Sequence, residues 1–287
     1  MGRSEDNKLH IVCCVKQVPD TAQVKIDPET NTLVRSGVES ICNPYDLVAT
    51  EAAVQLIEKY GGKVTVVSMG LPQAESVLRE CLALGAEEAI LLSDRAFAGA
   101  DTLATSYALS QAISLIASTD PVDLVLCGKQ AIDGDTGQTG PGLAIRLGYD
   151  LFTYVSEIVG VDLDEKTITV KREIEGGSEV IEGRLPALLT VELDLTSTRY
   201  ASLPDMVRAL RQDIKSWGAN DIGGSPERFG LKGSPTSVKE IFAPPVRKGG
   251  LVFDSTEDKD QAIEDFLDTF FEKETELLVE LLGSEGG

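Results

Sequence analysis

Short apolar runs alternate with helical patterns through the first 130 residues, and this alternation limits the fold more than any other feature. The apolar runs have the length of buried strands and span residues 9–15, 64–70, 86–94 and 122–128. Helical patterns separate them at 43–62, 72–84 and about 101–117, and Asp101 is the expected N-cap of the last. Because strands that alternate with helices form parallel sheets, the sequence predicts an α/β fold: a doubly wound, mostly parallel sheet with helices on both faces.

Beyond residue 150 the pattern changes to alternating apolar and polar residues. Turns at 164–166 and 175–178 divide it, which predicts an antiparallel meander that returns to the sheet at 185–193. A small hairpin is expected at 24–34, and a helix from Pro204 to about Ser216. These segments complete a predicted α/β domain over residues 1–217.

The C-terminal part has a different composition. Residues 218–250 are rich in Gly, Pro and Ser, so we expect them to be disordered or laid across another surface. Residues 260–283 form a strongly amphipathic helical pattern with an apolar stripe. Such a helix needs a groove, in another chain or in its own domain. We therefore predict that residues 218–287 form an extended arm whose C-terminal helix packs on a partner subunit.

The charge of the chain excludes several classes of partner. Lys and Arg number 26 and Asp and Glu 47, which gives a formal net charge of −21. Nucleic acids and anionic membrane surfaces are bound by cations, so neither is expected. No apolar run approaches the roughly 20 residues that span a bilayer. The polar start also lacks the apolar core of a signal peptide, so we expect a cytoplasmic protein without membrane insertion.

Side chains suited to acid–base, nucleophilic or metal chemistry are scarce. His10 is the only histidine and begins the first strand, so a Ser-His-Asp system is not expected and histidine-rich metal sites are excluded. The five cysteines form no CxxC pair, and several lie in apolar runs. We expect reduced structural thiols, no catalytic residue and no metal ligand.

The carboxyl ends of three predicted strands carry small or polar residues. In a doubly wound sheet, ligands bind at these ends where the strand order reverses. The first strand leads to Val15, Lys16 and Gln17, the second ends in Ser68, Met69 and Gly70, and the fourth opens into a loop that begins at residue 129. We expect the ligand site at these three exits.

That loop, KQAIDGDTGQTGPGLAIRLG, spans residues 129–148 and runs into a helical pattern. Thr139 followed by Pro141 predicts a helix start with Thr139 as its cap. The amides of residues 137–140 can then point at an anion, helped by the helix dipole. Gln138 and the hydroxyls of Thr136 and Thr139 add neutral donors.

Two aspartates in the same loop argue against phosphate as the only ligand. Asp133 and Asp135 suit ribose hydroxyls or backbone amides of the loop, so a nucleotide is the expected ligand. The loop matches neither GxGxxG nor a P-loop. A glycine-rich turn with an aspartate cap is therefore the structural alternative.

Four separated motifs resemble the beta subunit of electron transfer flavoproteins. They are VCCVKQVPDT in the first strand, NPYDLVATEAAVQL in the first helix, GKQAIDGDTGQTGP in the loop and TRYASLPDMVRA near residue 200. The match runs in order from residue 9 to about 215. It implies a Rossmann-like, adenine-nucleotide-binding fold and a heterodimer with an alpha subunit that carries an FAD.

The resemblance also implies what the pocket holds. In that family the beta pocket holds AMP in the ordinary members and a second FAD, reduced by NADH, in the electron-bifurcating members. The small residues of the loop favour FAD, because glycines let amides approach a pyrophosphate closely. The implied cofactor-binding residues are Val15, Lys16, Asn43, Asp46, Ser68, Gly70, Cys127, Asp133, Gly134, Asp135, Thr136, Gly137, Gln138 and Thr139.

The fourth motif resembles the family's recognition loop, which docks partner dehydrogenases through an exposed leucine. By position this is Leu203, and packing on its own helix is the alternative. The implied function is an electron-transfer subunit that passes electrons from NADH to the alpha-subunit FAD and to a dehydrogenase, quinone-reducing or ferredoxin-linked partner, by bifurcation. The alternatives are an AMP-binding structural subunit and, from another class, a nucleotide-binding stress or sensor protein. An adenylate-forming enzyme would need a different loop after the first strand.

Overall fold

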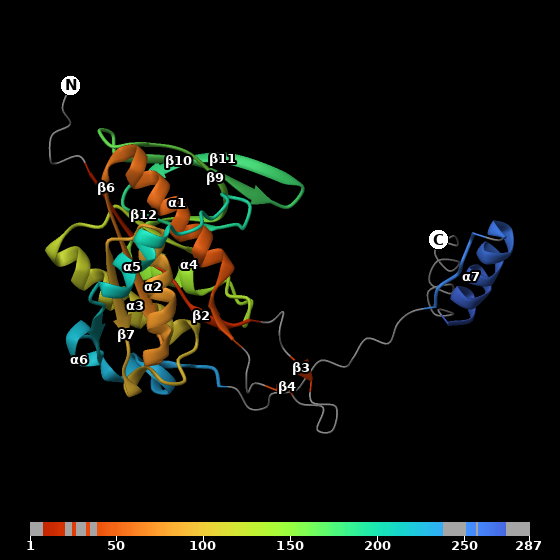
Figure 1. Cartoon of the computed structure of the whole chain (residues 1–287), viewed down its shortest axis with the longest axis horizontal. Coiled ribbons are helices and arrows are strands. Elements are labelled where there is room, and N and C mark those ends of the chain that lie inside the picture. The colour runs from red at the N-terminus through yellow and green to blue at the C-terminus, as the bar shows by residue number, and fades with distance from the viewer. Residues whose placement is uncertain are drawn as a thin grey trace, which may run out of the picture. The chain divides into compact units, whose positions relative to one another are not determined.

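The computed structural model describes residues 8–20, 25–26, 33–34, 39–237, 251–256 and 258–273. The chain forms two compact units, Met1–Ile241 and Phe242–Gly287. The first unit is built on a large sheet with helices packed against it (Figure 1). The second contains α7 (Lys259–Lys273).

The central sheet has nine strands in the order β11-β10-β9-β12-β8-β1-β6-β7-β13. Seven neighbouring strands, from β9 to β13, pair in parallel. They are β1 (Leu9–Cys14), β6 (Gly62–Met69), β7 (Glu88–Leu92), β8 (Leu124–Gly128), β9 (Asp150–Asp162), β12 (Ala187–Val191) and β13 (Lys215–Trp217). β10 (Thr167–Ile174) and β11 (Gly177–Arg184) continue the sheet in antiparallel pairing. The α/β fold with a mostly parallel sheet and a meander is confirmed.

Helices cover both faces of the parallel strands. One core cluster joins the sheet to α1 (Pro44–Tyr60), α2 (Glu75–Leu84) and α5 (Leu203–Arg211). The other joins it to α3 (Thr102–Thr119), α4 (Thr139–Leu147) and α6 (Ala219–Ile222). In β1, Ile11 and Cys13 belong to the first cluster, while Val12 and Cys14 belong to the second. Burial on both faces explains the continuous apolar run of this strand.

Shorter elements complete the described chain. β2 (Gln17–Pro19) pairs with β5 (Ser40–Cys42), and β3 (Lys25–Ile26) pairs with β4 (Leu33–Val34) as the expected hairpin. Short 3-10 turns occur at η2 (Pro72–Ala74), η3 (Arg95–Phe97), η4 (Pro226–Arg228) and η5 (Gly230–Gly233). Asp101 caps α3 as predicted, because its carboxylate accepts the amides of Leu103 and Ala104.

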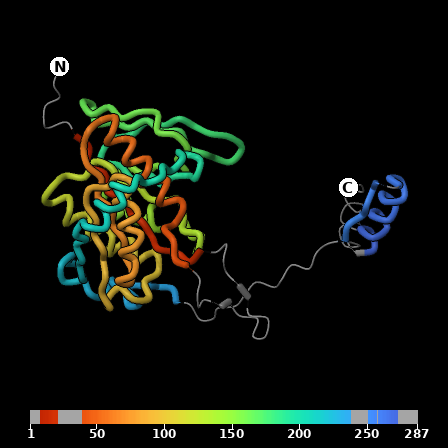
Figure 2. Tube along the Cα trace, viewed as in Figure 1, coloured from red at the N-terminus to blue at the C-terminus, as the bar shows by residue number. Residues whose placement is uncertain are grey.

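The structure differs from the sequence-based expectation after residue 203. The predicted helix to Ser216 ends at Arg211, since Lys215–Trp217 instead pair with β7 as an edge strand. The first unit also extends past the predicted boundary at residue 217. Ile222 and Phe229 are buried in the second cluster, so the Gly/Pro-rich segment to residue 237 is laid along the same unit (Figure 2).

Two further expectations concern the ends and the cysteines. α7 begins as expected, but the rest of the predicted helix, from residue 274, lies outside the described residues. All five cysteines are free and buried, as predicted. Within the described ranges no helix is long and apolar enough to cross a membrane.

Candidate functional site

The candidate site lies where the strand order reverses. β1 is hydrogen-bonded to β6 on one side and to β8 on the other, and both pairings are parallel. The chain proceeds from β1 through α1, β6 and α2 to β7, and then returns through α3 to β8 on the opposite side of β1. The exits of these three strands are therefore neighbours at one edge of the sheet, as predicted, and the edge is a topological switch point.

Asp46, in the first turn of α1, joins two of these exits. Its carboxylate accepts the amide of Lys16 at 2.9 Å and the amide of Gly128 at 2.8 Å. The residue is only 6% exposed, and burial raises its pKa to about 7 although both amides favour the carboxylate. Asp46 thus organises the backbone after β1 and β8.

Asn43, at the N-cap of α1, performs the same task for the loop. Its side chain makes no capping bond to its own helix. Instead its Nδ2 donates to the carbonyl of Gln130 at 2.9 Å, and its Oδ1 accepts the amide of Ile132 at 3.2 Å. Its own amide donates to the carbonyl of Lys16 at 2.9 Å. The buried Asn43 therefore holds the start of the loop against the exit of β1.

The two loop aspartates are each bound by a side chain of the protein. The Lys16 ammonium contacts both oxygens of Asp133, at 2.7 and 2.8 Å. Asp135 accepts the Nε2 of Gln130 at 2.9 Å and has a left-handed backbone, with a φ of +49°. The negative charge of Asp133 is thus matched by a neighbouring cation, which lowers the repulsion that an aspartate would exert on a phosphate.

The helix after the loop begins one residue earlier than predicted. Thr139 is the first helical residue, and Gln138 occupies the cap position without a side-chain capping bond. The reason is that the amide of Gly142 donates to the carbonyl of Gln138 at 3.0 Å. The Oε1 of Gln138 accepts the hydroxyl of Thr102 at 3.0 Å. Because the first amides of a helix have no acceptor within it, those that follow Gly137 remain donors for an anion.

The other predicted residues divide into lining groups and buried groups. The Ser68 hydroxyl is buried and has no hydrogen-bond partner among the described residues. Val15 and Cys127 point their side chains into the core, so only their backbones can face a ligand. Thr136 is exposed, and Gly70 donates its amide to Leu92. Around Gly134, nothing lies within 4 Å of where a Cβ would stand.

A cluster around Lys129, the first residue of the loop, was not predicted. Lys129 Nζ binds both oxygens of Glu192, at 2.9 and 3.0 Å, and this contact raises the lysine's pKa. The same ammonium lies 5.8 Å from the ring centre of Tyr45 and 5.5 Å from that of Tyr154. Lys129 follows β8, Glu192 follows β12, and the two tyrosines lie in α1 and β9. Because the four residues belong to distant parts of the chain, no local pattern could have joined them.

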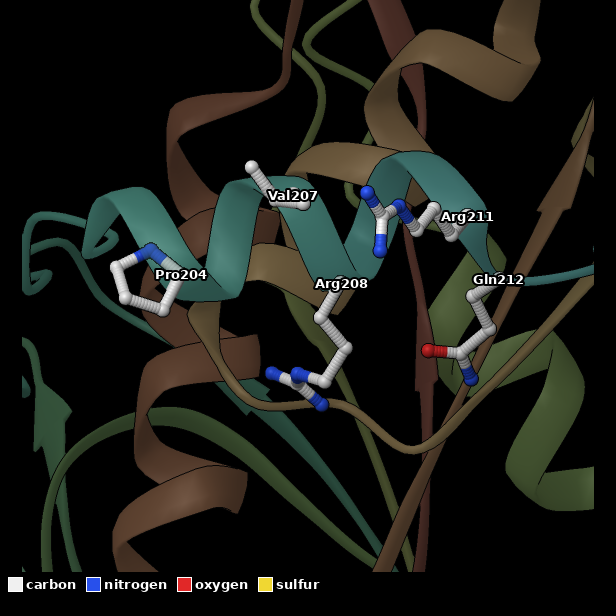
Figure 3. A pocket seen from close by; sticks show the side chains of 5 residues that line it. All are labelled: Pro204, Val207, Arg208, Arg211 and Gln212. Carbon is white, nitrogen blue, oxygen red and sulfur yellow. The ribbon is translucent and has the colours of Figure 1, made fainter.

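Leu203, the leucine that the resemblance implies for docking a redox partner, is 73% exposed at the start of α5. A shallow cavity of about 480 Å³ lies along this helix and is lined by Pro204, Val207, Arg208, Arg211 and Gln212 (Figure 3). A second cavity, of about 460 Å³, lies between α1, α2 and the segment that leads into α5. Neither cavity includes a residue of the 129–148 loop, so the exposed α5 and the loop are separate features.

Among the described residues, no cluster of three or more His, Cys, Asp or Glu side chains is arranged to hold a metal ion. Burial raises the pKa of the thiols of Cys13, Cys14 and Cys127, which keeps them protonated. The sheet edge brings together backbone amides, the hydroxyl of Ser68 and the Lys16–Asp133 ion pair.

Comparison with known proteins identifies the family. The profile of the "Electron transfer flavoprotein domain" matches residues 30–221. Protein FixA of Azotobacter vinelandii is 54% identical over 83% of this chain and 85% of its own. The electron transfer flavoprotein subunit beta of Megasphaera elsdenii is 46% identical over 90% and 96%, respectively. The caffeyl-CoA reductase-Etf complex subunit CarD of Acetobacterium woodii is 50% identical over 86% and 93%. The chain therefore belongs to the electron transfer flavoprotein family, as a beta subunit in the branch that includes the FixA proteins.

Proposed function

We propose that the sheet-edge site holds FAD and that the chain passes electrons from NADH to the FAD of an alpha subunit by electron bifurcation. The observation that carries this proposal is the set of contacts within the loop. Lys16 binds Asp133 and Gln130 binds Asp135, so both carboxylates are occupied while the amides beyond Gly137 begin a helix. Amides at a helix start can bind a pyrophosphate, and carboxylates that already have partners repel it less.

The chain's own residues would bind and orient such a cofactor. Gln138 and the amides of the first turn of α4 would hold phosphate oxygens, and the hydroxyls of Thr136 and Thr139 are further donors. The unpartnered Ser68 hydroxyl fits a polar atom of the ligand, because a buried hydroxyl without a partner is costly. Asp133 and Asp135 would support ribose hydroxyls with the lone pairs that Lys16 and Gln130 leave unused. When bound, FAD supplies the redox chemistry, since a flavin accepts a hydride and releases single electrons.

Space at the loop favours FAD over AMP. Gly134 has no atom within 4 Å of its Cβ position, and Gly137 has a φ of +60°. The open space at Gly134 leaves room for the second phosphate that distinguishes a flavin dinucleotide from AMP. An AMP-binding beta subunit would use the same residues and is the alternative that the cofactor analysis must separate.

Membership of the family as a beta subunit implies an alpha-subunit partner and redox partners. We propose that the C-terminal arm packs on the alpha subunit, since Ile263, Phe266 and Phe270 of α7 are exposed in the second unit. We further propose that Leu203 docks the redox partner, a dehydrogenase or a quinone-reducing or ferredoxin-linked protein. The complex named for CarD contains a reductase, which fits a partner of this kind.

Anaerobic addition of NADH to the purified heterodimer tests the electron-transfer proposal. We expect the visible absorption of the flavin to bleach without any other protein present. No bleaching would contradict the role of NADH.

In a second assay, Leu203→Ala is expected to raise the KM for the protein acceptor while leaving NADH bleaching unchanged. An unchanged KM would contradict docking through this leucine.

A further inference from the structure

Helix α5 displays an apolar stripe to solvent. Leu203, Met206, Val207 and Leu210 follow the spacing of one helix face, and their exposed fractions range from 39 to 73%. Ala209 is the only residue of the helix that is buried. Apolar packing against its own domain therefore supplies little of what holds this helix in place.

The chain segment that enters α5 is fixed by Arg199. Its guanidinium contacts both oxygens of Glu51 at 2.9 to 3.1 Å and both oxygens of Glu58 at 2.7 and 3.0 Å. Its amide also donates to Glu51, at 3.3 Å. Both glutamates lie on α1, two turns apart, and the Glu51 side chain is only 2% exposed. Arg199 thus bonds the segment before α5 to two residues of α1.

The other end of α5 is fixed by Arg79 of α2. Its Nη1 donates at 2.7, 3.2 and 3.2 Å to three backbone carbonyls, those of Ala209, Leu210 and Gln212. Glu75, one turn earlier on α2, binds the same guanidinium. In return, Arg208 of α5 donates to the carbonyl of Leu82, in the last turn of α2, at 3.1 Å. Each helix thus supplies an arginine for the unpaired carbonyls at the end of the other.

We propose that Arg199 and Arg79 are positioning residues that together hold α5 in one orientation, so that the apolar stripe is presented ready for docking to an apolar groove of the redox partner. This inference rests on the proposed docking at Leu203. A helix that is already ordered loses less conformational entropy when it binds. With its stripe in solvent, α5 depends on these polar contacts for that order.

Hydrogen exchange of the intact heterodimer tests whether Arg199 and Arg79 hold α5 in place, and it needs no redox partner. In Arg79→Gln and, separately, Glu58→Gln, we expect amide exchange in residues 203–211 to quicken by about 2- to 10-fold, the range that corresponds to the net loss of one hydrogen bond. Exchange in β1 and in α1, and the bound cofactor, are expected to stay unchanged. Glu58 is the safer change at the Arg199 end, because its side chain is 56% exposed and Arg199 keeps Glu51 as a partner.

Matched variants separate positioning from general destabilisation. Arg95→Gln removes an equal charge from an exposed residue of η3, and it is expected to leave exchange in α5 unchanged. Arg79→Lys, which can still reach a carbonyl, is expected to restore part of the protection. Unchanged exchange of α5 in both Arg79→Gln and Glu58→Gln would overturn the proposed role of Arg199 and Arg79. An equal increase in exchange throughout the sheet would overturn it as well. Because this assay needs no acceptor, its failure is distinct from failure of docking, which Leu203→Ala reports.

Discussion

Asp46 accepts the amide of Gly128 at 2.8 Å and so connects the first turn of α1 to the end of β8, 82 residues later in the chain. The same carboxylate accepts the amide of Lys16 at the end of β1. One buried side chain therefore sets the spacing of two strand exits at the switch point. The consequences of this relationship can be tested by substitution.

Replacement of Asp46 by asparagine should destabilise the site. The amide group has one oxygen, so either the Lys16 or the Gly128 amide would lose its acceptor. An unsatisfied buried donor costs about 1–3 kcal/mol, and the free energy of unfolding of the heterodimer in urea should fall by that amount. A loss of cofactor at equal protein concentration should accompany it. Unaltered stability would show that the two amides do not depend on this carboxylate.

The free energy of unfolding should depend on pH through the titration of Asp46. Its folded-state pKa, about 7, lies above its ordinary value of 3.8, so the folded state holds this proton more tightly than the unfolded state. The associated stability is complete below pH 3.8 and is lost as the pH rises to about 7. The unfolding free energy of the wild type minus that of Asp46→Asn should therefore decrease across this window. A difference that is constant or increases with pH would contradict the raised pKa of this buried carboxyl group.

Two glycines near the site should respond in opposite ways to alanine. A Cβ at Gly128 would stand 2.3 Å from the Cβ of Tyr45 and 2.6 Å from Oδ1 of Asp46, so α1 would have to move. Gly128→Ala should cost about 1–3 kcal/mol or more, as overpacking does. Gly134→Ala is the control, because the added Cβ meets nothing within 4 Å. Thermal unfolding of the two variants should differ clearly, and equal midpoints would refute the close approach at Gly128.

Charge at position 134 should decide whether a phosphate is retained. Gly134→Asp and Gly134→Asn add side chains of nearly equal size into open space, but only the aspartate adds a negative charge. At a few ångströms from a phosphate, one charge near a protein surface opposes binding by about 1–4 kcal/mol, which is roughly 5- to 1,000-fold in affinity. Dialysis followed by measurement of retained nucleotide should show a loss in the aspartate variant alone. Equal loss in both variants would point to size and not to charge.

Local patterns predicted most of the fold. The buried run at 9–15 and the helical pattern at 43–62 correspond to β1 and α1, because burial on two faces and helical periodicity both leave marks on neighbouring residues. β13 has only three residues and follows a helix closely, so its pairing with β7 left no comparable pattern. Ile222 and Phe229 were too sparse to predict that the Gly/Pro-rich segment packs on the first unit.

The meeting of the three strand exits was predictable, and the contacts between them were not. Because parallel strands end at one edge of a sheet, the order of the strands is enough to bring Lys16, Ser68 and the 129–148 loop together. The bonds that shape the site join residues far apart in the chain. Asn43 reaches Gln130 and Ile132, and Lys129 reaches Glu192 across 63 residues. Such pairs depend on the tertiary arrangement, and the sequence alone does not reveal them.

The central claim, that the loop holds a flavin dinucleotide, is tested most directly by the cofactor content of the heterodimer. The chain is produced together with its alpha subunit, purified without added nucleotide and denatured, and the released FAD and AMP are quantified. We predict two FAD and no AMP for each heterodimer. One FAD and one AMP would contradict the claim and would make the sheet-edge site a structural AMP site.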